Sequence, residues 1–506
     1  IQIKTPFGVY DEGFAVFNAT RIMNGDIPYK DFWAIYPPGQ FYTLAILFKT
    51  FGVSLLAARL YDTFVRLIII ISVWLIAKKV THPTLAYFAS ITATVMLASA
   101  NLYTYAVFPA LALSLLAILS LLEYMDTEQL YWLFLAGILI GLTFFFRWDI
   151  GLYVAISASA TIFLFCFFRI RKESIPSGKM LFNPFQIAMV AGTALIVALV
   201  GYGCVGLVSG FENLWDQVVV FPTTMLREVR WLPYPMLLPT KSEFLPWIRF
   251  YFPLFVYGIA FSYYIYSILK KHIVLNTQYF GSIAIVILGV LLFAQAISRY
   301  DYIHVVPTSL MAMLVAFSLL SQNVFKRTNL ITKLLRISFL AGLISLYIVL
   351  PVIMLLHSLS DFSPLECYSQ VERASCVYLQ KDQERAIEYV RAHTIENEAI
   401  FVGNQRHDLI FINDIGFYFL SARQSASRYH ELYPGVATTL PIQQEIVRDI
   451  ESKNVKWIIL VQVPKSTEPN ASASSSGIRY LDNFIQSKYL PVETFGNYQI
   501  LQKITR

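Results

Sequence analysis

Ten apolar stretches follow one another along residues 55–357, and most are close to the length of one bilayer crossing. A helix needs about 20 predominantly apolar residues to cross the hydrocarbon core. We therefore expect transmembrane helices at 55–77, 83–100, 105–123, 131–146, 150–168, 185–208, 247–269, 279–297, 304–321 and 335–357. With 57% hydrophobic and only 14% charged residues, the chain cannot form a single water-soluble core. The sequence predicts an α-helical polytopic membrane protein.

The positions of the basic residues predict its orientation, because lysine and arginine accumulate in cytoplasmic loops. If residues 1–54 lie outside, the inner loops carry Lys78 and Lys79; Arg169, Arg171, Lys172 and Lys179; Lys270 and Lys271; and Lys326, Arg327, Lys333 and Arg336. An even number of crossings then places residues 358–506 outside as well. These positions matter more than the net charge of +7, so we expect a lipid bilayer and no nucleic acid as a partner.

Three regions follow from this pattern. Residues 1–54 form an outer loop with an interfacial helix at 37–52, which is too short to cross, and residues 55–357 form the transmembrane domain. Residues 358–506 alternate helix-like and strand-like segments, which predicts a soluble extracytoplasmic α/β domain. Its tract 466–477 has the composition of a flexible loop. Because the chain does not begin with Met, we also expect a first transmembrane helix upstream.

The four cysteines do not form a disulfide scaffold. Cys166 and Cys204 lie in apolar stretches and are expected to be buried small hydrophobic residues, whereas Cys367 and Cys376 could be bridged in an oxidising compartment. No glycine-rich phosphate loop, CxxC pair, HExxH helix or GxSxG motif is present in the sequence. Nucleotide hydrolysis, structural zinc and serine hydrolysis therefore have no motif in their favour.

Ionisable residues stand where a membrane protein normally avoids them. Asp11 and Glu12 precede the apolar region and could bind headgroups, cap a helix, or act as an acid or base at the membrane surface. Arg59, Asp62 and Arg66 share one face of the first expected span, either as an internal ion pair or as the wall of a polar cavity.

Basic residues also occur on the expected outer side, against the usual bias. They lie in two turns that contain Arg-x-Asp and in the long outer loop: Arg147 with Asp149; Arg299 with Asp301 and His304; and Arg227, Arg230 and Lys241. Such residues could be anchors that reach the headgroups. Their guanidinium groups also match phosphate oxygens bidentately, which favours a lipid phosphate as ligand.

The order of these features resembles the GT-C superfamily of integral-membrane glycosyltransferases. The resemblance is to the branch that contains protein O-mannosyltransferases and bacterial lipid A aminoarabinose and lipopolysaccharide-core transferases. It covers residues 9–357 and is carried by Asp11-Glu12, the segment YPPGQFYTLAILFKTFG, the helix start LLAARLYD, Arg147 and the turn RYDYIH. Tyr36 departs from the pattern, since some relatives have a carboxylate or histidine before the proline pair. The second carboxylate is therefore open among Glu12, Asp31, Asp149 and Asp301.

The resemblance implies transfer of one sugar from a polyprenyl-phosphate donor to a hydroxyl of a glycan, lipid or protein, with inversion. Asp11, with Glu12 beside it, would be the general base, and Arg147, Arg299, His304 and Arg59 would bind the donor phosphate. Asp149, Asp301, Tyr36, Arg227 and Arg230 would support the site or face the acceptor. The resemblance implies no required cofactor, leaves a divalent metal open, and places the enzyme in a bacterial inner membrane with its active site outside the cytoplasm.

Two other classes of protein remain compatible with the sequence. A transporter or flippase of lipid-linked glycans would also need polar groups in the membrane, although it usually has internal repeats, which this chain lacks. A non-catalytic glycan-binding membrane protein would keep the fold and have no working base.

Overall fold

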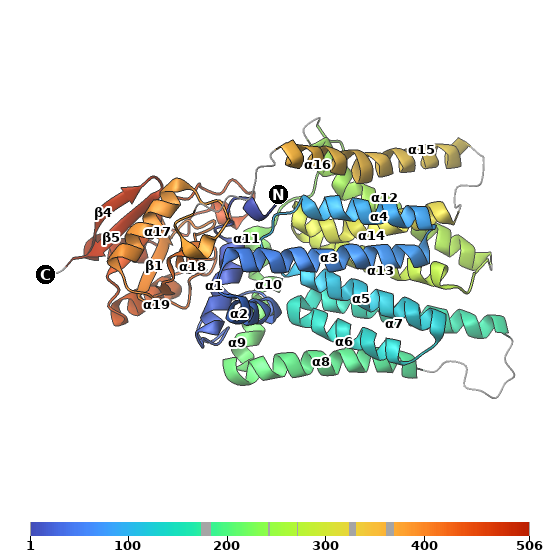
Figure 1. Ribbon diagram of the computed structural model, residues 1–506, viewed down its shortest axis with the longest axis horizontal. Coiled ribbons are helices and arrows are strands. Elements are labelled where there is room, and N and C mark those ends of the chain that lie inside the picture. The colour runs from blue at the N-terminus through green and yellow to red at the C-terminus, as the bar shows by residue number, and fades with distance from the viewer. Residues whose placement is uncertain are drawn as a thin grey trace.

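A computed structural model describes residues 2–173, 184–240, 243–270, 272–322, 330–360 and 369–504. The molecule is elongated, with a helical bundle at one end and an α/β domain at the other (Figure 1). The chain begins between these two parts, and the N-terminal helices α1 (Asp11–Met23) and α2 (Gly39–Phe51) lie there too. The N-terminal helices and the C-terminal α/β domain therefore lie at the same end of the bundle.

Each expected span coincides with an apolar helix. The helices are α3 (Leu55–Val80), α4 (Pro83–Ala98), α5 (Val107–Thr127), α6 (Tyr131–Phe146), α7 (Trp148–Glu173), α8 (Phe185–Ser209), α12 (Phe244–Leu269), α13 (Thr277–Ser298), α14 (Tyr302–Ser321) and, in series, α15 (Leu330–Ile344), η3 (Ser345–Val349) and α16 (Leu350–Ser360). Within the described residues, eight spans are long and apolar enough to cross a membrane, and α4 and α6 are shorter. The chain is an integral membrane protein, and a tenfold crossing stays a prediction.

The bundle has an interior and a periphery. Helices α5, α13 and α14 are largely buried by their neighbours, whereas α8 lies at the edge and exposes most of its surface. This explains one wrong prediction, because Cys204 on α8 is exposed rather than buried, while Cys166 is half-buried. Apolar residues of a helix at the edge of a transmembrane bundle can face lipid, so their hydrophobicity does not indicate burial by other helices.

Helix α2 occupies the segment expected to be interfacial, and its position at a membrane surface remains a prediction. Helix α1 packs closely on α18 (Gly416–Ser421) of the α/β domain, where a side chain at Gly13 would lie 2.5 Å from the Gly416 nitrogen. The segment after α8, expected to be an outer loop, forms four short helices: α9 (Phe211–Trp215), η2 (Asp216–Val220), α10 (Phe221–Thr223) and α11 (Met225–Arg230). Lys241 lies outside the described residues.

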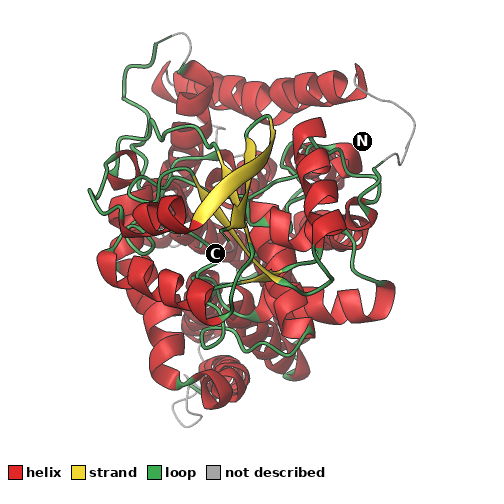
Figure 2. Ribbon diagram, turned by 90° about the vertical axis from the view of Figure 1, so that its left-hand side faces the viewer, coloured by secondary structure: helices red, strands yellow, loops and turns green. Residues whose placement is uncertain are grey.

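The α/β domain contains a mixed sheet in the order β2-β1-β3-β5-β4. Strands β1 (Ala399–Asn404), β2 (Gln424–Ser425) and β3 (Trp457–Val461) are parallel, and β5 (Tyr498–Lys503) pairs antiparallel with β3 and with β4 (Tyr489–Phe495). Helices α17 (Lys381–His393), α19 (Leu440–Ser452) and α20 (Tyr480–Lys488) complete the domain, whose sheet is seen in Figure 2. The predicted fold class, a helical membrane domain with a C-terminal α/β domain, is confirmed.

The tract 466–477 is not a free loop, because Asn470 Nδ2 donates to the Trp231 carbonyl at 2.7 Å and Ser466 and Ser472 are buried. Its polar composition reflects hydrogen bonds to the membrane domain. Cys376 is disulfide-bonded, and Cys367 lies outside the described residues.

Candidate active site

Asp11 is the first residue of α1, and its carboxylate remains exposed. Its Oδ2 accepts a hydrogen bond from the Tyr105 hydroxyl at 3.2 Å, and it caps no helix, since no side-chain bond satisfies the start of α1. The surrounding protein desolvates this carboxyl and raises its pKa, although Tyr105 and Arg230 oppose the shift. Solvent thus reaches Asp11, yet its hydration is incomplete, which favours proton uptake at higher pH than usual.

Glu12, the next residue, is fully buried and forms a bidentate ion pair with Arg59 on α3. Arg59 Nε and Nη2 each donate to one Glu12 oxygen at 2.7 Å, and the Gly8 amide donates to Oε2 at 3.1 Å. The remaining Arg59 nitrogen donates to the carbonyls of Ile3 and Thr5. Glu12 and Arg59 therefore hold the N-terminal segment on the bundle, and neither faces Asp11. This geometry does not favour the predicted roles of Glu12 in catalysis and Arg59 in phosphate binding.

The other two ionisable residues of α3 form an internal pair, one of the two alternatives that the sequence left open. Arg66 Nη2 lies 2.9 Å from Asp62 Oδ2, and its Nη1 donates to the carbonyls of Leu97 and Ala100. Both side chains are almost fully buried. They connect α3 to the segment after α4, and they do not line an open surface.

Arg147 stands in extended backbone between α6 and α7, with φ at −151°. Its Nε and Nη2 donate to the two oxygens of Asp149 at 2.9 and 2.7 Å, and Gln295 Nε2 also donates to Asp149 at 3.0 Å. Within the described residues Nη1 has no hydrogen-bond partner. Asp149 thereby orients the guanidinium and leaves one of its nitrogens able to bind another anion.

The second turn has the same form. Arg299 is also extended, with φ at −149°, and its Nε donates to Asp301 Oδ2 at 3.0 Å. Asp301 caps α14, because its Oδ1 accepts from the His304 amide at 3.1 Å and contacts His304 Nδ1 at 2.6 Å. The predicted Arg-x-Asp-x-x-His motif is therefore a structural unit that holds Arg299 through Nε and leaves its two terminal nitrogens to other partners.

Arg299 also binds a carboxylate of the α/β domain. Its Nη2 and Nη1 donate to the two oxygens of Glu468 at 2.7 and 3.2 Å, and Nη1 donates to the Arg230 carbonyl at 2.6 Å. Arg230 Nη1 lies 3.9 Å from Glu468, too far for a hydrogen bond, and is buried without a partner in the described part of the chain. Buried donors are almost always satisfied, so this nitrogen is a candidate anion-binding group.

A further carboxylate approaches from the α/β domain. Glu431 is 1% exposed, and its Oε1 accepts from the Tyr10 hydroxyl at 2.6 Å while Oε2 has no partner among described residues. Burial raises the pKa of Glu431 to about 8; the charge of Asp11 adds to the shift, and Tyr10 and Arg230 oppose it. Glu431 is therefore largely protonated at neutral pH.

Tyr36 completes the group with a side chain that is 37% exposed. Burial of its hydroxyl raises its pKa to about 12, with Asp11 and Glu431 acting in the same direction and Arg147 and Arg230 against it. Asp11, Tyr36 and the residues whose charge or hydrogen bond shifts the pKa of either one are called the Asp11 cluster here: Asp11, Tyr36, Tyr105, Arg147, Arg230, Arg299, Asp301 and Glu431.

Two further candidates, Arg227 and Asp31, also lie outside the Asp11 cluster. Arg227 is exposed on α11 and has no hydrogen bond or ion pair within the described residues. Asp31 accepts a hydrogen bond from the Ile27 amide at 2.7 Å and stabilises its own turn. Neither side chain acts on the Asp11 carboxyl, so neither is retained as a site residue.

Four residues of this region had no signal in the sequence: Tyr105, Glu431, Glu468 and Gln295. Only Glu468 belongs to a tract that the sequence singled out, and there its composition indicated a loop. Their contribution depends on how the α/β domain docks and how helices pack. Local patterns carry no information about either.

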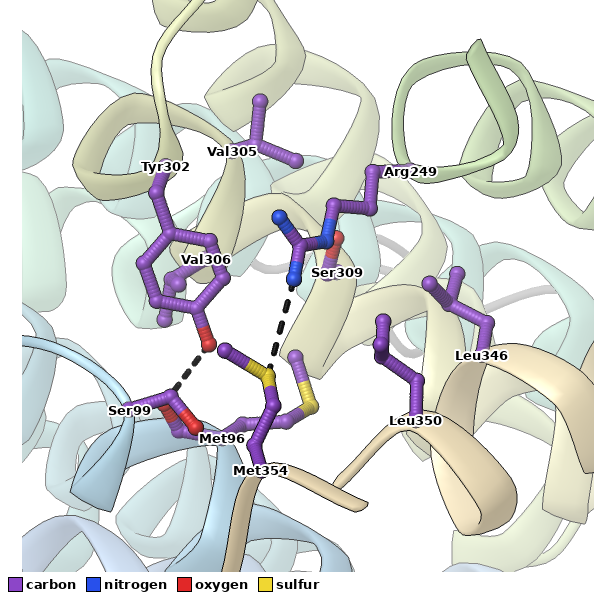
Figure 3. A pocket seen from close by; sticks show the side chains of 10 residues that line it. All are labelled: Met96, Ser99, Arg249, Tyr302, Val305, Val306, Ser309, Leu346, Leu350 and Met354. Atoms are coloured by element: carbon purple, nitrogen blue, oxygen red, sulfur yellow. Dashed lines mark hydrogen bonds between the residues drawn. The ribbon is translucent and has the colours of Figure 1, made fainter. Parts of the chain in front are cut away.

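A small pocket lies next to the second turn, beside Tyr302 (Figure 3). Apolar residues of α4, α14 and α16 line most of it, and Arg249 packs over the Tyr302 ring at 5.0 Å. Its lining contains no carboxylate or histidine. The pocket therefore offers no acid or base, and the chemistry belongs to the Asp11 cluster.

Comparisons with known proteins agree with this architecture. Residues 36–200 match the family model described as dolichyl-phosphate-mannose-protein mannosyltransferase. No curated protein matches the chain in a sequence search.

Solved structures resemble the chain over its whole length. ArnT from Cupriavidus metallidurans bound to undecaprenyl phosphate superposes with a TM-score of 0.54 at 12% identity, covering 100% of this chain and 95% of that one. Its apo form gives 0.53 at 13%, covering 99% and 95%. The oligosaccharyltransferase AglB from Archaeoglobus fulgidus gives 0.45 at 13%, and covers 89% of this chain and 65% of AglB. The likeness to ArnT confirms the resemblance to GT-C proteins at the level of the fold.

Proposed function

We propose that the protein transfers a sugar from a polyprenyl-phosphate carrier to an acceptor hydroxyl, with inversion at the anomeric carbon. The observation that carries the proposal is the Asp11 cluster. In it, a solvent-reachable carboxylate, whose pKa is raised by burial, is grouped with arginines from three separate parts of the chain. General bases in enzymes are commonly carboxylates whose pKa burial has raised toward the working pH. A tether to headgroups would need no such surroundings.

In the proposed step, the acceptor hydroxyl gives its proton to the Asp11 carboxylate. The acceptor oxygen attacks the anomeric carbon, and the bond between that carbon and the phosphate oxygen breaks. The phosphate leaves with the electron pair, so the sugar is transferred and polyprenyl phosphate is released. Tyr105, which donates to Asp11 Oδ2, orients the carboxylate and leaves Oδ1 for the incoming proton.

The arginines would stabilise the departing phosphate. Arg147 Nη1 and Arg230 Nη1 have no hydrogen-bond partner among the described residues, and they can donate to phosphate oxygens without breaking an existing hydrogen bond. Arg299 is already bidentate to Glu468, so a phosphate would have to share or replace that carboxylate. Prepositioned donors of this kind stabilise developing charge because they need no reorganisation.

The class of donor is supported by the proteins that the chain resembles. The family model is named for a dolichyl-phosphate sugar, and ArnT was solved with undecaprenyl phosphate. Both carriers are polyprenyl phosphates. The identity of the sugar, and whether a glycan, lipid or protein accepts it, are left to experiment.

We place the site outside the cytoplasm, in a bacterial inner membrane. The α/β domain and the start of α3 lie at one end of the bundle (Figure 1), and Lys78 and Lys79 lie at the other end of the same helix. The bias of lysine toward the cytoplasm supports this orientation. The proposal requires no metal, because guanidinium groups supply the positive charge at the phosphate; a chelator is therefore expected to leave the rate unchanged.

Release of polyprenyl phosphate from a panel of polyprenyl-phosphate sugars tests the proposal, with purified protein and a membrane extract as acceptor source. We expect one donor to be consumed, the new glycosidic bond to have the inverted anomeric configuration, and Asp11→Asn to abolish release. If no donor is consumed, or if the intact donor only crosses the bilayer, the protein is not this enzyme. The second result would indicate a flippase.

A further inference from the structure

A polar cavity of about 380 Å³ lies between the α/β domain and the turn that joins α2 to α3. Its lining combines Val53 with residues of η4 (Glu372–Ala374), of the end of α17 and the segment after it, and of the end of α18 and the segment after it: Val53, Glu372, Arg373, Arg391, Glu396, Leu420, Ala422 and Arg423. It shares no lining residue with the Asp11 cluster. We call it the arginine cavity.

The three arginines of this cavity are poorly compensated by acidic groups. Arg423 is 6% exposed and uses its guanidinium on neutral acceptors only, among them the Thr394 carbonyl at 2.7 Å and the Ser421 carbonyl at 2.9 Å. Arg391 is exposed and has no side-chain partner within the described residues. Buried charges in proteins are normally paired, and Arg423 has no carboxylate partner among the described residues, so the cavity favours an anionic ligand.

The acidic residues at the cavity do not provide that anion. Glu396 is the nearest carboxylate to Arg373 at 3.8 Å, which is longer than a hydrogen bond, and its side chain is 70% exposed. Glu372 is exposed. The Glu398 carboxylate accepts a hydrogen bond from the Ile395 amide at 3.1 Å and does not pair with these arginines in the described part of the chain. Arg373 Nη1 donates to the Phe419 carbonyl at 3.0 Å, which leaves its other nitrogens without a hydrogen bond in the described part of the chain. Arg373 and Arg391 can therefore still donate to an anion, and Arg423 adds a third positive charge to the cavity lining.

The position of the cavity indicates the source of its anion. Val53 immediately precedes Ser54, which caps the first transmembrane helix α3. Nearby side chains on α2 and α3 expose apolar surface to the surroundings: Phe51 78%, Leu60 51% and Phe64 61%. Exposed apolar residues at the start of a transmembrane helix face the acyl chains, so the cavity directly above them is at the level of the lipid headgroups.

We infer that the arginine cavity binds the phosphate of an anionic membrane lipid, separately from the proposed donor site. Arg373 and Arg391 donate to the phosphate oxygens, and the acyl chains extend along the exposed apolar face of α2 and α3. Such a lipid joins the α/β domain to the membrane surface, because its headgroup contacts the domain and its tails contact the bundle. Guanidinium groups favour this ligand for their planar match to phosphate.

The test measures phosphatidylglycerol binding to the detergent-solubilised full chain by native mass spectrometry, with phosphatidylcholine and inorganic phosphate as comparison ligands. Arg391→Glu reverses the exposed charge, and Arg448→Glu on α19 makes the same change of net charge away from the cavity. We expect tighter binding of phosphatidylglycerol than of phosphatidylcholine. Losing one charge-assisted contact should raise its apparent Kd by about tenfold in Arg391→Glu and leave Arg448→Glu unchanged.

Three outcomes would overturn the inference. The first is equal binding of phosphatidylglycerol and phosphatidylcholine, and the second is an equal loss of binding in Arg391→Glu and Arg448→Glu. The third is inorganic phosphate binding as tightly as phosphatidylglycerol, which would make the cavity a site for free anions. Arg373→Gln serves as a second variant with the same expected weakening. Unfolding temperatures without added lipid check that each variant is folded.

Discussion

Asp11 and Glu12 differ in environment because successive helical residues point about 100° apart. Asp11 faces Tyr105 and solvent, whereas Glu12 faces the bundle and binds Arg59 through both oxygens. A buried carboxylate with two guanidinium bonds has no lone pair well placed for an acceptor proton. The proposed catalytic carboxylate, Asp11, is thus adjacent in the chain to the structural carboxylate, Glu12, and their substitutions should have opposite effects on activity and stability.

Glu12→Gln should destabilise the protein, because it leaves the fully buried Arg59 charge without its partner. Breaking a buried ion pair typically costs about 3–5 kcal/mol. Asp11→Asn removes one exposed charge and should change the unfolding free energy by less than about 1 kcal/mol. Denaturation of both variants in the same detergent measures the difference, and equal losses would contradict these assignments.

Glu431 should make the α/β domain less stable as the pH rises. Burial raises its folded pKa to about 8, above the ordinary value of 4.5, so the folded state holds a proton that the unfolded state releases. Its contribution to stability is fully present below about pH 4.5 and is lost as the pH rises through 8. Asp414, raised to about 6 by burial, acts in the same direction at lower pH. Glu431→Gln should flatten the decline in unfolding temperature between pH 6 and 9; an unchanged pH profile would contradict the raised pKa.

The sequence located Asp11 but could not separate its role from that of Glu12, since both precede an apolar helix and carry the same charge. It gave no indication of Glu431, which lies in the segment RYHELY without any motif. Burial and docking decide the chemistry of such residues, and both are tertiary properties.

At the scale of elements, the two Arg-x-Asp turns share one design. Each arginine follows the last residue of an apolar bundle helix in extended backbone, and the aspartate two residues later accepts a hydrogen bond from its Nε. Periodicity and span length predicted both turns correctly. They could not predict that Glu468 would occupy the Arg299 fork, because the tract 466–477 has the composition of a linker.

Helix α11 offers a matched pair of arginines for testing the phosphate assignment. Arg230 carries a buried, unpartnered Nη1 within the Asp11 cluster, and Arg227 is exposed on the same short helix. Replacing Arg230 by Lys keeps the charge and removes the planar fork, so donor affinity should fall by about 1–3 kcal/mol. Arg227→Lys should leave it unchanged. Donor binding by isothermal titration decides between them, and a parallel loss in both variants would point to a disturbed α11 and contradict a specific phosphate contact of Arg230.

At the scale of the whole molecule, the Asp11 cluster joins the two ends of the sequence. Asp11 and Tyr36 come from the N-terminal segment, Arg147 and Arg299 from the bundle, and Glu431 from the α/β domain. The spans and the soluble domain follow from hydrophobicity and periodicity, so they were predicted. The docking of the domain on α1, with its close contact between Gly13 and Gly416, leaves no trace in local patterns.

The orientation predicts opposite labelling of two exposed positions. Gln129 lies in the turn between α5 and α6 at the end distant from the α/β domain, and Ser474 lies in that domain. A cysteine at Ser474 should react with a membrane-impermeant maleimide in intact cells, whereas a cysteine at Gln129 should react only after permeabilisation. Labelling of the wild-type chain provides the background. Reaction of both positions from the same side would show that the topology is wrong.

The base role of Asp11 is the central claim, and donor binding measured beside single-turnover transfer in Asp11→Asn tests it most directly. The amide keeps the shape of the side chain and loses its basicity, so donor affinity should stay near wild type. The transfer rate should fall by about 100-fold to 10,000-fold. In the wild type, the rate should decline as the pH falls through the raised pKa of Asp11, above the ordinary carboxyl value of 3.8. A variant that transfers sugar at the wild-type rate, or that loses only donor affinity, would contradict the assignment of Asp11 as the base.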